Sequence, residues 1–375
     1  MTAKKWAYLW FVSIFFLAIV TMLINYFIDP YGIYNTNLLK IKKTRQSNKG
    51  SLVKIIEVKN IKPASLAVGD SRVHKGINVE HPYFIQPAYN AGLGSQTMYE
   101  SRKFFEYALK FGNLKKVLLG LSYVSFNRPM QKTVSDFESY FNMNYFKYIL
   151  TYDQLIDSIF TILKIMPTQS HFKNGVADPN FGLKKIIENG TYLHNFKALE
   201  KNFYRDISTD YRYKDTGRNS FEDFELIVKK CYENNISLDM IISPTHVRLW
   251  EVLDYKVGYD RFLKWKKDVV VAVDKISKKY NKKPFRIFDF AVYHKLTNEK
   301  IPEKPGIEMR YFRDTSHFTF VIGNIILDRL MGKTDYEDFG VELNTNNIDE
   351  HLKKLKNDRA KFIDTEVYIK EVFSK

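Results

Sequence analysis

The chain has 375 residues, of which 27% are charged and 45% hydrophobic, and its formal net charge is +16. This length can bury one large core or two modest ones, and the single cysteine, Cys231, excludes an intramolecular disulfide. The positive charge favours anionic partners, or it reflects a solvated lysine-rich surface. We expect no nucleic-acid partner, because the sequence lacks zinc-ligand spacing, a basic region with heptads and an aromatic RNA-binding signature. No cluster has convincing metal-ligand spacing, so we also expect no metal and no cofactor.

The N-terminal segment is predicted to be a membrane anchor, residues 1–29. Lys4 and Lys5 precede an uncharged segment whose apolar core, Trp6 to Ile24, is long enough for a membrane-spanning helix of about 20 residues. A signal peptide would have a shorter apolar region and a small-residue cleavage site. The two lysines favour a cytoplasmic N-terminus, so we expect the rest of the chain to be extracytoplasmic.

A polar, basic connector, residues 30–62, leads to a predicted α/β domain at 63–335. Five short apolar runs alternate with helical patterns and are predicted to be strands. These runs are residues 64–68, 85–89, 117–121, 238–242 and 285–290. Helices are predicted at 97–111, 221–233, 259–280 and 321–331. Such alternation predicts right-handed crossovers and a mostly parallel five-stranded sheet covered by helices on both faces.

Two segments depart from this alternation. Residues 128–218 are rich in aromatic side chains and are predicted to be a helical insertion or cap, with a helix at 152–166. This insertion would be a satellite core or, alternatively, a substrate groove whose aromatic faces suit sugar rings. Residues 336–375 are predicted to be a charged helical tail.

The polar residues that could carry chemistry follow the predicted strands. Gly69-Asp70-Ser71-Arg72 follows the first strand, and Asp314-Thr315-Ser316-His317 lies after the fifth. The carboxyl ends of parallel strands share one edge of a sheet, so these motifs are expected to meet there. A serine needs a base to remove its proton, and a nearby carboxylate can orient that base. We therefore predict Ser71 as nucleophile, His317 as base and Asp314 as its partner.

The oxyanion of an acyl-transfer intermediate needs preorganised N–H donors. The candidates are the Ser71 amide and an amide near Gly92 and Gly94, where glycine allows close backbone approach. His246, in the loop after the fourth strand, is a weaker candidate for substrate contact and could equally be structural.

This arrangement resembles the SGNH, or GDSL, hydrolase superfamily over most of residues 64–332. Gly69-Asp70-Ser71 matches the nucleophile block, Asn90-Ala91-Gly92 the second block, and Asp314-Thr315-Ser316-His317 the terminal Asp-x-x-His block. The resemblance implies a flavodoxin-like three-layer sandwich and the triad roles given above.

Two blocks depart from the family pattern. The later glycine of the second block is displaced, with Ser95 near that position, and the third block appears as Gly120-Leu121-Ser122-Tyr123 without its oxyanion asparagine. Ser122 or Asn127 could substitute for that asparagine. Arg72 could bind the oxyanion or an acidic substrate.

A membrane-anchored chain with a divergent third block is similar to the superfamily members that act on bacterial envelope polymers. These include the teichoic-acid D-alanyl-transfer protein and the O-acetyltransferases of exopolysaccharides. The resemblance implies transfer of an O-acyl group, expected to be acetyl, through acyl-Ser71 to an anionic or neutral envelope or exported glycan. It also implies a multipass membrane-bound O-acyltransferase as partner. The alternatives are an extracytoplasmic carbohydrate esterase or deacetylase, and a non-catalytic membrane-anchored polysaccharide-binding protein.

Overall fold

The computed structural model describes residues 2–36, 38–41, 43, 45–127, 137–142, 144–165, 174–362 and 371. The chain forms two compact units, which are described separately. Residues 1–57 and 135–171 form the first unit, and residues 58–134 and 172–375 form the second. The boundary at 171 falls inside the segment 128–218, so that segment is divided between the two units.

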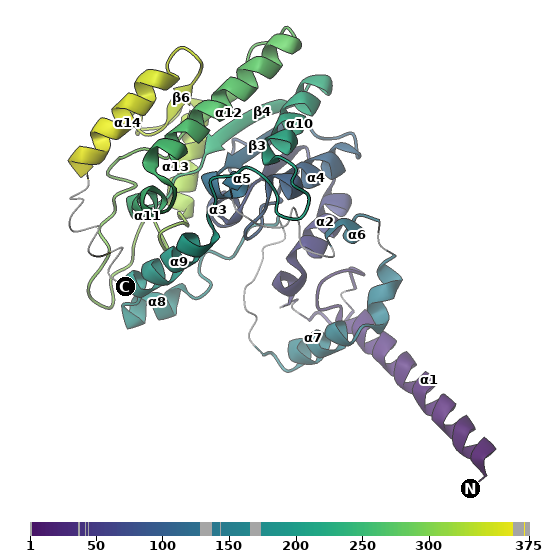
Figure 1. Cartoon of the computed structure of the whole chain (residues 1–375). Coiled ribbons are helices and arrows are strands. Elements are labelled where there is room, and N and C mark those ends of the chain that lie inside the picture. The colour runs from purple at the N-terminus through teal and green to yellow at the C-terminus, as the bar shows by residue number, and fades with distance from the viewer. Residues whose placement is uncertain are drawn as a thin grey trace. The chain divides into compact units, whose positions relative to one another are not determined.

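The first unit is helical and contains the long apolar helix α1 (Ala3–Ile28). Its other helices are η1 (Gln46–Lys49), the first part of α2 (Gly50–Ile61), α6 (Phe137–Tyr140), η2 (Tyr145–Leu150) and α7 (Tyr152–Ile162). The most apolar 18-residue stretch of α1 has a mean hydropathy of 2.4, and none of it is buried. Helix α1 is therefore long and apolar enough to cross a membrane. Both η2 and α7 pack against α1 near its C-terminal end (Figure 1).

The second unit contains a six-stranded mixed sheet with strand order β2-β1-β3-β4-β5-β6. The strands are β1 (Ser65–Val68), β2 (Ala88–Asn90), β3 (Lys116–Leu121), β4 (Ser237–Ile242), β5 (Arg286–Asp289) and β6 (Val341–Leu343). Strands β1 to β5 pair in parallel, and β6 pairs with β5 in the antiparallel sense.

The prediction of five strands is therefore wrong, although the prediction of a mostly parallel sheet is confirmed. Strand β6 has only three residues, Val341-Glu342-Leu343, and it follows the predicted domain end at 335. So short a run carries no usable alternation, because period-two patterns become informative only over four or more residues. Its pairing with the edge of β5 defines it as a strand.

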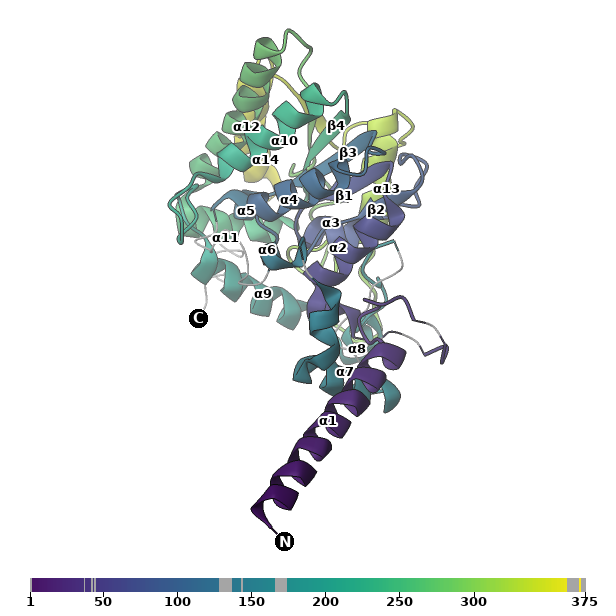
Figure 2. The ribbon, with the colours of Figure 1, turned by 90° about the vertical axis from the view of Figure 1, so that its right-hand side faces the viewer.

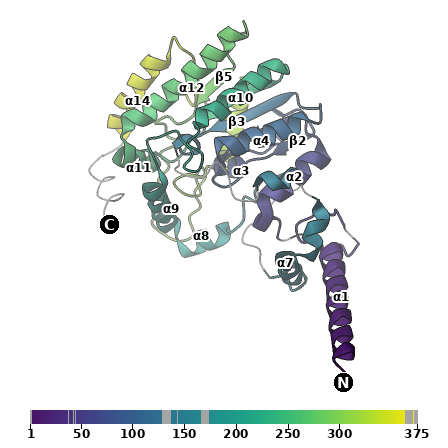
Figure 3. The same cartoon turned by 45° about the vertical axis from the view of Figure 1, so that its right-hand side comes forward.

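Helices cover both faces of this sheet. The helices of the second unit include α3 (Ser71–Gly76), α4 (Met98–Leu109), α5 (Tyr123–Asn127), α8 (Leu183–Asn189), α9 (Tyr192–Asp206), α10 (Ser220–Glu233), α11 (Val247–Val257), α12 (Tyr259–Lys279), α13 (Phe320–Met331) and α14 (Ile348–Phe362). Figure 2 shows β1 and β3 between α4 and α10 on one side and α3 and α13 on the other. Helices α4, α10 and α12 lie side by side on their face (Figure 3). Strand β3 is accordingly buried from Val117 to Leu121, as expected for a strand covered on both faces.

A buried ionic cluster joins α12, β5 and α14. The Nζ atom of Lys266 donates to Oδ2 of Asp289 at 2.6 Å, and Nε2 of His351 lies 2.8 Å from the same oxygen. All three side chains are buried. The first part of the predicted charged tail is thus a helix held onto the sheet, and residues 363–370 and 372–375 of that tail lie outside the described residues.

Candidate active site

A tight turn between β1 and α3 carries Ser71. A Cβ atom at Gly69 would lie 2.9 Å from the backbone oxygen of Gly120 and 2.6 Å from the side chain of Val73. Only glycine allows the chain to pass so close to the end of β3. Asp70 then acts as the N-cap of α3, and Ser71 is the first residue of that helix.

The carboxylate of Asp70 holds this turn together. One oxygen accepts the Arg72 amide at 3.0 Å, and the other accepts the Arg72 guanidinium and the Ser122 hydroxyl, the latter at 2.7 Å. Arg72 and Ser122 are both buried. A buried, charge-assisted network of this kind fixes its geometry, so the turn that presents Ser71 is tied to the end of β3.

Ser71, His317 and Asp314 form one continuous hydrogen-bond relay. Oγ of Ser71 lies 2.8 Å from Nε2 of His317, and Nδ1 of His317 lies 2.7 Å from Oδ2 of Asp314. If the carboxylate accepts from Nδ1–H, then Nε2 is the acceptor for the serine proton. Ser71 and His317 are 246 residues apart in the sequence. The structure brings them and Asp314 together, as the sequence predicts.

The loop from Asp314 to His317 is shaped by its own carboxylate. Oδ1 of Asp314 accepts the amides of Ser316 and His317 at 2.8 and 2.9 Å. An antiparallel bridge between Phe312 and Phe318 closes the loop. Asp314 therefore sets both the course of the backbone and the orientation of the imidazole.

The electrostatics of the relay keep Asp314 ionised and His317 neutral. Burial alone would raise the pKa of Asp314, but attraction to His317 and the hydrogen bonds it accepts, with help from Lys75, lower that pKa to about 2. Burial lowers the pKa of His317, and the positive charges of Lys75 and Arg72 lower it further against the opposing attraction of Asp314. A neutral imidazole near neutral pH is the form that can accept a proton from serine.

Lys75 is the residue of this site that the sequence analysis missed. It lies on α3, four residues after Ser71, so one helical turn places it on the same side as the nucleophile. Its charge lowers the pKa of both His317 and Asp314. The spacing of four residues between Ser71 and Lys75 could have indicated that the two side chains lie on the same face of a helix.

The second block supports α3. Nδ2 of Asn90 donates to the backbone oxygens of Val73 and Ile77, both at 2.9 Å, and Oδ1 of Asn90 accepts the Gly92 amide at 2.9 Å. A Cβ at Gly92 would lie 2.7 Å from the backbone nitrogen of His74. Gly92 thus permits close packing onto α3, and its amide, proposed from sequence as an oxyanion donor, is engaged by Asn90. Gly94 is exposed, with open space around it.

The remaining candidates have other partners. Ser122 donates to Asp70 as described, Arg72 is paired with Asp70, and Nδ2 of Asn127 donates to the Tyr123 oxygen at 3.0 Å within α5. His246 is the N-cap of α11: its Nδ1 accepts the Arg248 amide, and its Nε2 bonds to the Glu299 carbonyl at 2.8 Å. Burial lowers the pKa of His246 to about 4. These bonds occupy both ring nitrogens of His246, which fits the structural role left open for it.

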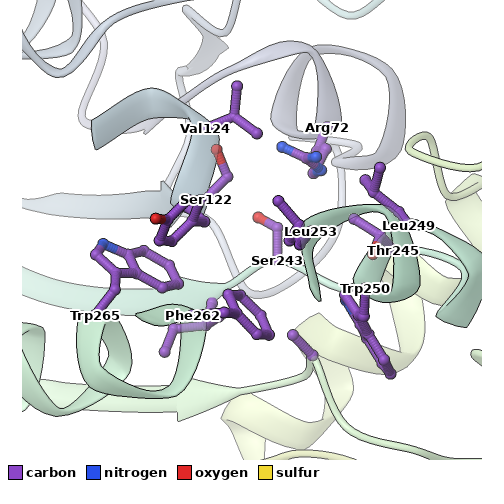
Figure 4. Close-up of a pocket in the computed structure, with 13 residues that line it drawn as sticks. Arg72, Ser122, Val124, Ser243, Thr245, Leu249, Trp250, Leu253, Phe262 and Trp265 are labelled. Atoms are coloured by element: carbon purple, nitrogen blue, oxygen red, sulfur yellow. The ribbon is translucent and has the colours of Figure 1, made fainter. Parts of the chain in front are cut away.

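A small cavity lies beyond the carboxyl ends of β3 and β4, and Arg72 is one of its walls (Figure 4). Its volume of about 20 Å³ suits roughly one water molecule. Four buried polar atoms of its lining have no hydrogen-bond partner among the described residues: Nε of Arg72, Oγ of Ser243, Oγ1 of Thr245 and Nε1 of Trp265. Ser122 also lines the cavity, and α11 and α12 contribute the apolar side chains of Leu249, Leu253 and Phe262.

No group of three or more His, Cys, Asp or Glu side chains that could hold a metal ion occurs in the part of the chain that the structure describes. The relay itself offers the chemistry of a serine, a histidine and a carboxylate. Comparison with known proteins adds no assignment, since no protein-family model and no curated protein sequence matches the chain.

Proposed function

We propose that this chain is a membrane-anchored, serine-dependent O-acyltransferase. It would pass an acyl group, expected to be acetyl, through acyl-Ser71 to a hydroxyl of an envelope or exported polysaccharide. The observation that carries the proposal is the unbroken relay from Ser71 through His317 to Asp314, with contacts of 2.8 and 2.7 Å. The resemblance of its motifs to the SGNH superfamily supports the same chemistry.

In the first half-reaction, Ser71 attacks the acyl carbonyl of the donor while its proton passes to Nε2 of His317. Asp314 stabilises the imidazolium that forms. The tetrahedral intermediate then collapses, the bond to the donor's leaving group breaks, and His317 returns the proton to that group. The Ser71 amide belongs to the first turn of α3, where amides have no intrahelical acceptor, and it is our candidate oxyanion donor.

In the second half-reaction, a glycan hydroxyl gives its proton to His317 and attacks the acyl-Ser71 carbonyl. The new ester forms on the glycan, and His317 returns the proton to Oγ of Ser71. If water replaced the glycan, the same steps would release free acid, which is the esterase alternative. The two activities share every residue of the relay and differ in the acceptor.

The apolar helix α1 and the two lysines in its first turn support anchoring with the catalytic unit on the outer side of the membrane. An acyl donor made in the cytoplasm must cross the bilayer to reach such a site. A multipass membrane-bound O-acyltransferase is the partner that would supply it.

The test uses the full chain in lipid vesicles with an activated acetyl ester as donor and candidate glycans as acceptors. We expect mass spectrometry to find one acetyl group on the peptide that contains Ser71, and acetylated glycan to accumulate. Ser71→Ala should abolish both. Ser237→Ala, at the exposed start of β4, is the matched control and should change neither.

Each alternative gives a different result. Release of acetate without acetylated glycan would establish the esterase. A folded wild-type chain that never acylates at Ser71 would contradict the catalytic proposal and favour the binding protein.

A further inference from the structure

Helix α7 of the first unit buries its polar face and exposes its apolar face. Its buried side chains are all polar: Gln154, Asp157, Ser158 and Thr161. Apart from Asp153, its exposed side chains are apolar: Tyr152 is 73% exposed, Ile159 38% and Ile162 49%. An amphipathic helix on a soluble protein has the opposite arrangement, with the apolar stripe facing the core.

Hydrogen bonds to α1 fix this orientation. Oγ of Ser158 donates to Oδ1 of Asn25 at 3.0 Å, and Nε2 of Gln154 donates to the Asn25 carbonyl at 3.2 Å. In return, Nδ2 of Asn25 donates to the carbonyl of Ile149 at 2.9 Å. Asn25 lies in the last turn of α1 and is fully buried. Rotation of α7 to hide its apolar face would break these bonds.

A second anchor point lies on the same polar face. The Tyr31 hydroxyl donates to Oδ2 of Asp157 at 2.7 Å, and Nδ2 of Asn48 donates to both oxygens of that carboxylate at about 3 Å. Hydrogen bonds of Gln154 Nε2, Asp157 and Ser158 thus hold the polar side of α7 within the unit, whereas apolar side chains of the other side are exposed.

The exposed apolar face continues beyond α7. Phe146 and Leu150 of η2 and Leu163 at the end of α7 are 72%, 54% and 63% exposed. We name the six residues Phe146, Leu150, Tyr152, Ile159, Ile162 and Leu163 the apolar platform. Exposed apolar side chains gathered on two consecutive elements point to a contact with a partner or a membrane.

The position of the platform along α1 matches a membrane interface. The apolar run of α1 ends at Ile24, one residue before Asn25, where α7 is attached. At about 1.5 Å per residue the run from Trp6 to Ile24 is close to the roughly 30 Å thickness of a hydrocarbon core. Helix α7 and η2, which carry the platform, both pack against the C-terminal part of α1, and α7 lies beside that end of α1 in Figures 1 and 2.

We infer that the apolar platform inserts into the lipid bilayer interface as a second membrane contact beside α1. This inference rests on membrane anchoring by α1, which is part of the proposed function. Three features favour lipid as the occupant: η2 and α7 pack against α1, whose own apolar side chains are exposed; the platform includes the aromatic residues Phe146 and Tyr152; and the exposed Lys147 and Lys164 suit anionic headgroups. The contact would fix how deep α1 inserts.

The experiment measures membrane depth at single labelled positions in the full chain. In a Cys231→Ala background, cysteine is placed at Tyr152 or Leu163 on the platform, and at Asp153, the exposed neighbour on α7, as the matched control. Each variant carries a polarity-sensitive dye and is reconstituted into phosphatidylcholine–phosphatidylglycerol vesicles with spin-labelled lipids. We expect the dye at 152 and 163 to be quenched several-fold more by shallow spin labels than the dye at 153, and to emit at shorter wavelength.

Equal quenching at positions 152, 153 and 163 would overturn the inference. Dyes at 152 and 163 that are shielded from water in native membranes but exposed to water in pure lipid vesicles would also overturn it. That result would favour a membrane protein as the occupant of the platform. A dye at Phe16→Cys reports on α1 separately: quenching there by deep spin labels, without quenching at 152 and 163, leaves the anchor intact and rejects the platform. Lack of quenching at position 16 rejects the anchor itself. Acylation of Ser71 is measured independently of both.

Discussion

The hydroxyl of Ser122 donates a hydrogen bond to the carboxylate of Asp70 at 2.7 Å and so joins the end of β3 to the turn that carries Ser71. Ser122 stands where the third block of the SGNH pattern has its oxyanion asparagine. Its observed bond points to a different task, since it holds the nucleophile turn through Asp70. The proposed reaction consequently relies more on backbone amides than on side chains to stabilise its oxyanion.

Asp314→Asn should lower the rate of Ser71 acylation by a factor of about 10³ to 10⁴. An amide at this position can donate to Nδ1, which would move the imidazole proton to Nε2 and leave no acceptor for the serine proton. The measurement is the burst of acylation with an activated ester, with circular dichroism as the folding control. A loss of less than about tenfold would contradict the orienting role of Asp314.

The acid limb of the pH–rate profile should have its midpoint below pH 6.5, the ordinary pKa of histidine. The base must be neutral to work, and burial together with Lys75 and Arg72 lowers the pKa of His317. Lys75→Met removes one of these positive charges, so the pKa of His317 should rise and the midpoint should move to higher pH. Lys304→Met, at an exposed lysine, should leave the midpoint in place. A downward shift in the Lys75 variant would contradict this account.

Gly92→Ala should destabilise the second unit by about 1–3 kcal/mol. The new Cβ would lie 2.7 Å from the backbone nitrogen of His74, and backbone cannot move aside as a side-chain tip can. Gly94→Ala is a close control, because nothing lies within 4 Å of a Cβ there. Urea unfolding of both variants measures the difference, and equal stabilities would show that α3 tolerates displacement.

Lys266→Met should cost about 3–5 kcal/mol of unfolding free energy. It removes the ammonium that faces the buried carboxylate of Asp289, so that His351 is the ionisable side chain that still contacts this charge. Lys267→Met removes an exposed pair with Asp349 and should cost less than about 1 kcal/mol. Thermal unfolding compares the two, and a similar small cost for both would show that the buried cluster is not important for stability.

Much of the catalytic arrangement could be predicted because it depends on strand ends. Ser71 lies in the turn after β1, and Asp314 and His317 share one short loop, so a parallel sheet brings them to the same edge. The predicted strand at 85–89 begins three residues before β2, because the prediction followed the apolar residues and did not take Pro87 into account. Proline has no amide for a ladder, and pairing extends from Ala88 to Asn90.

Other features could not be predicted because they depend on which side of an element faces inward. The period of 152–166 predicts two faces for that helix but does not say which is buried, and α7 buries the polar one. The partner of Ser122 was equally hidden, since a hydroxyl after a strand can serve an oxyanion or a neighbouring carboxylate. Tertiary contacts decide both cases.

The attachment of α7 to Asn25 also bears on how the protein can be produced. A chain shortened to begin after Asp29 would lose the hydrogen-bond partner of Ser158 and Gln154 while it kept the apolar platform. Such a product would self-associate through that surface even though its hydrophobic helix is gone. A soluble preparation therefore requires polar substitutions on η2 and α7 as well as removal of α1.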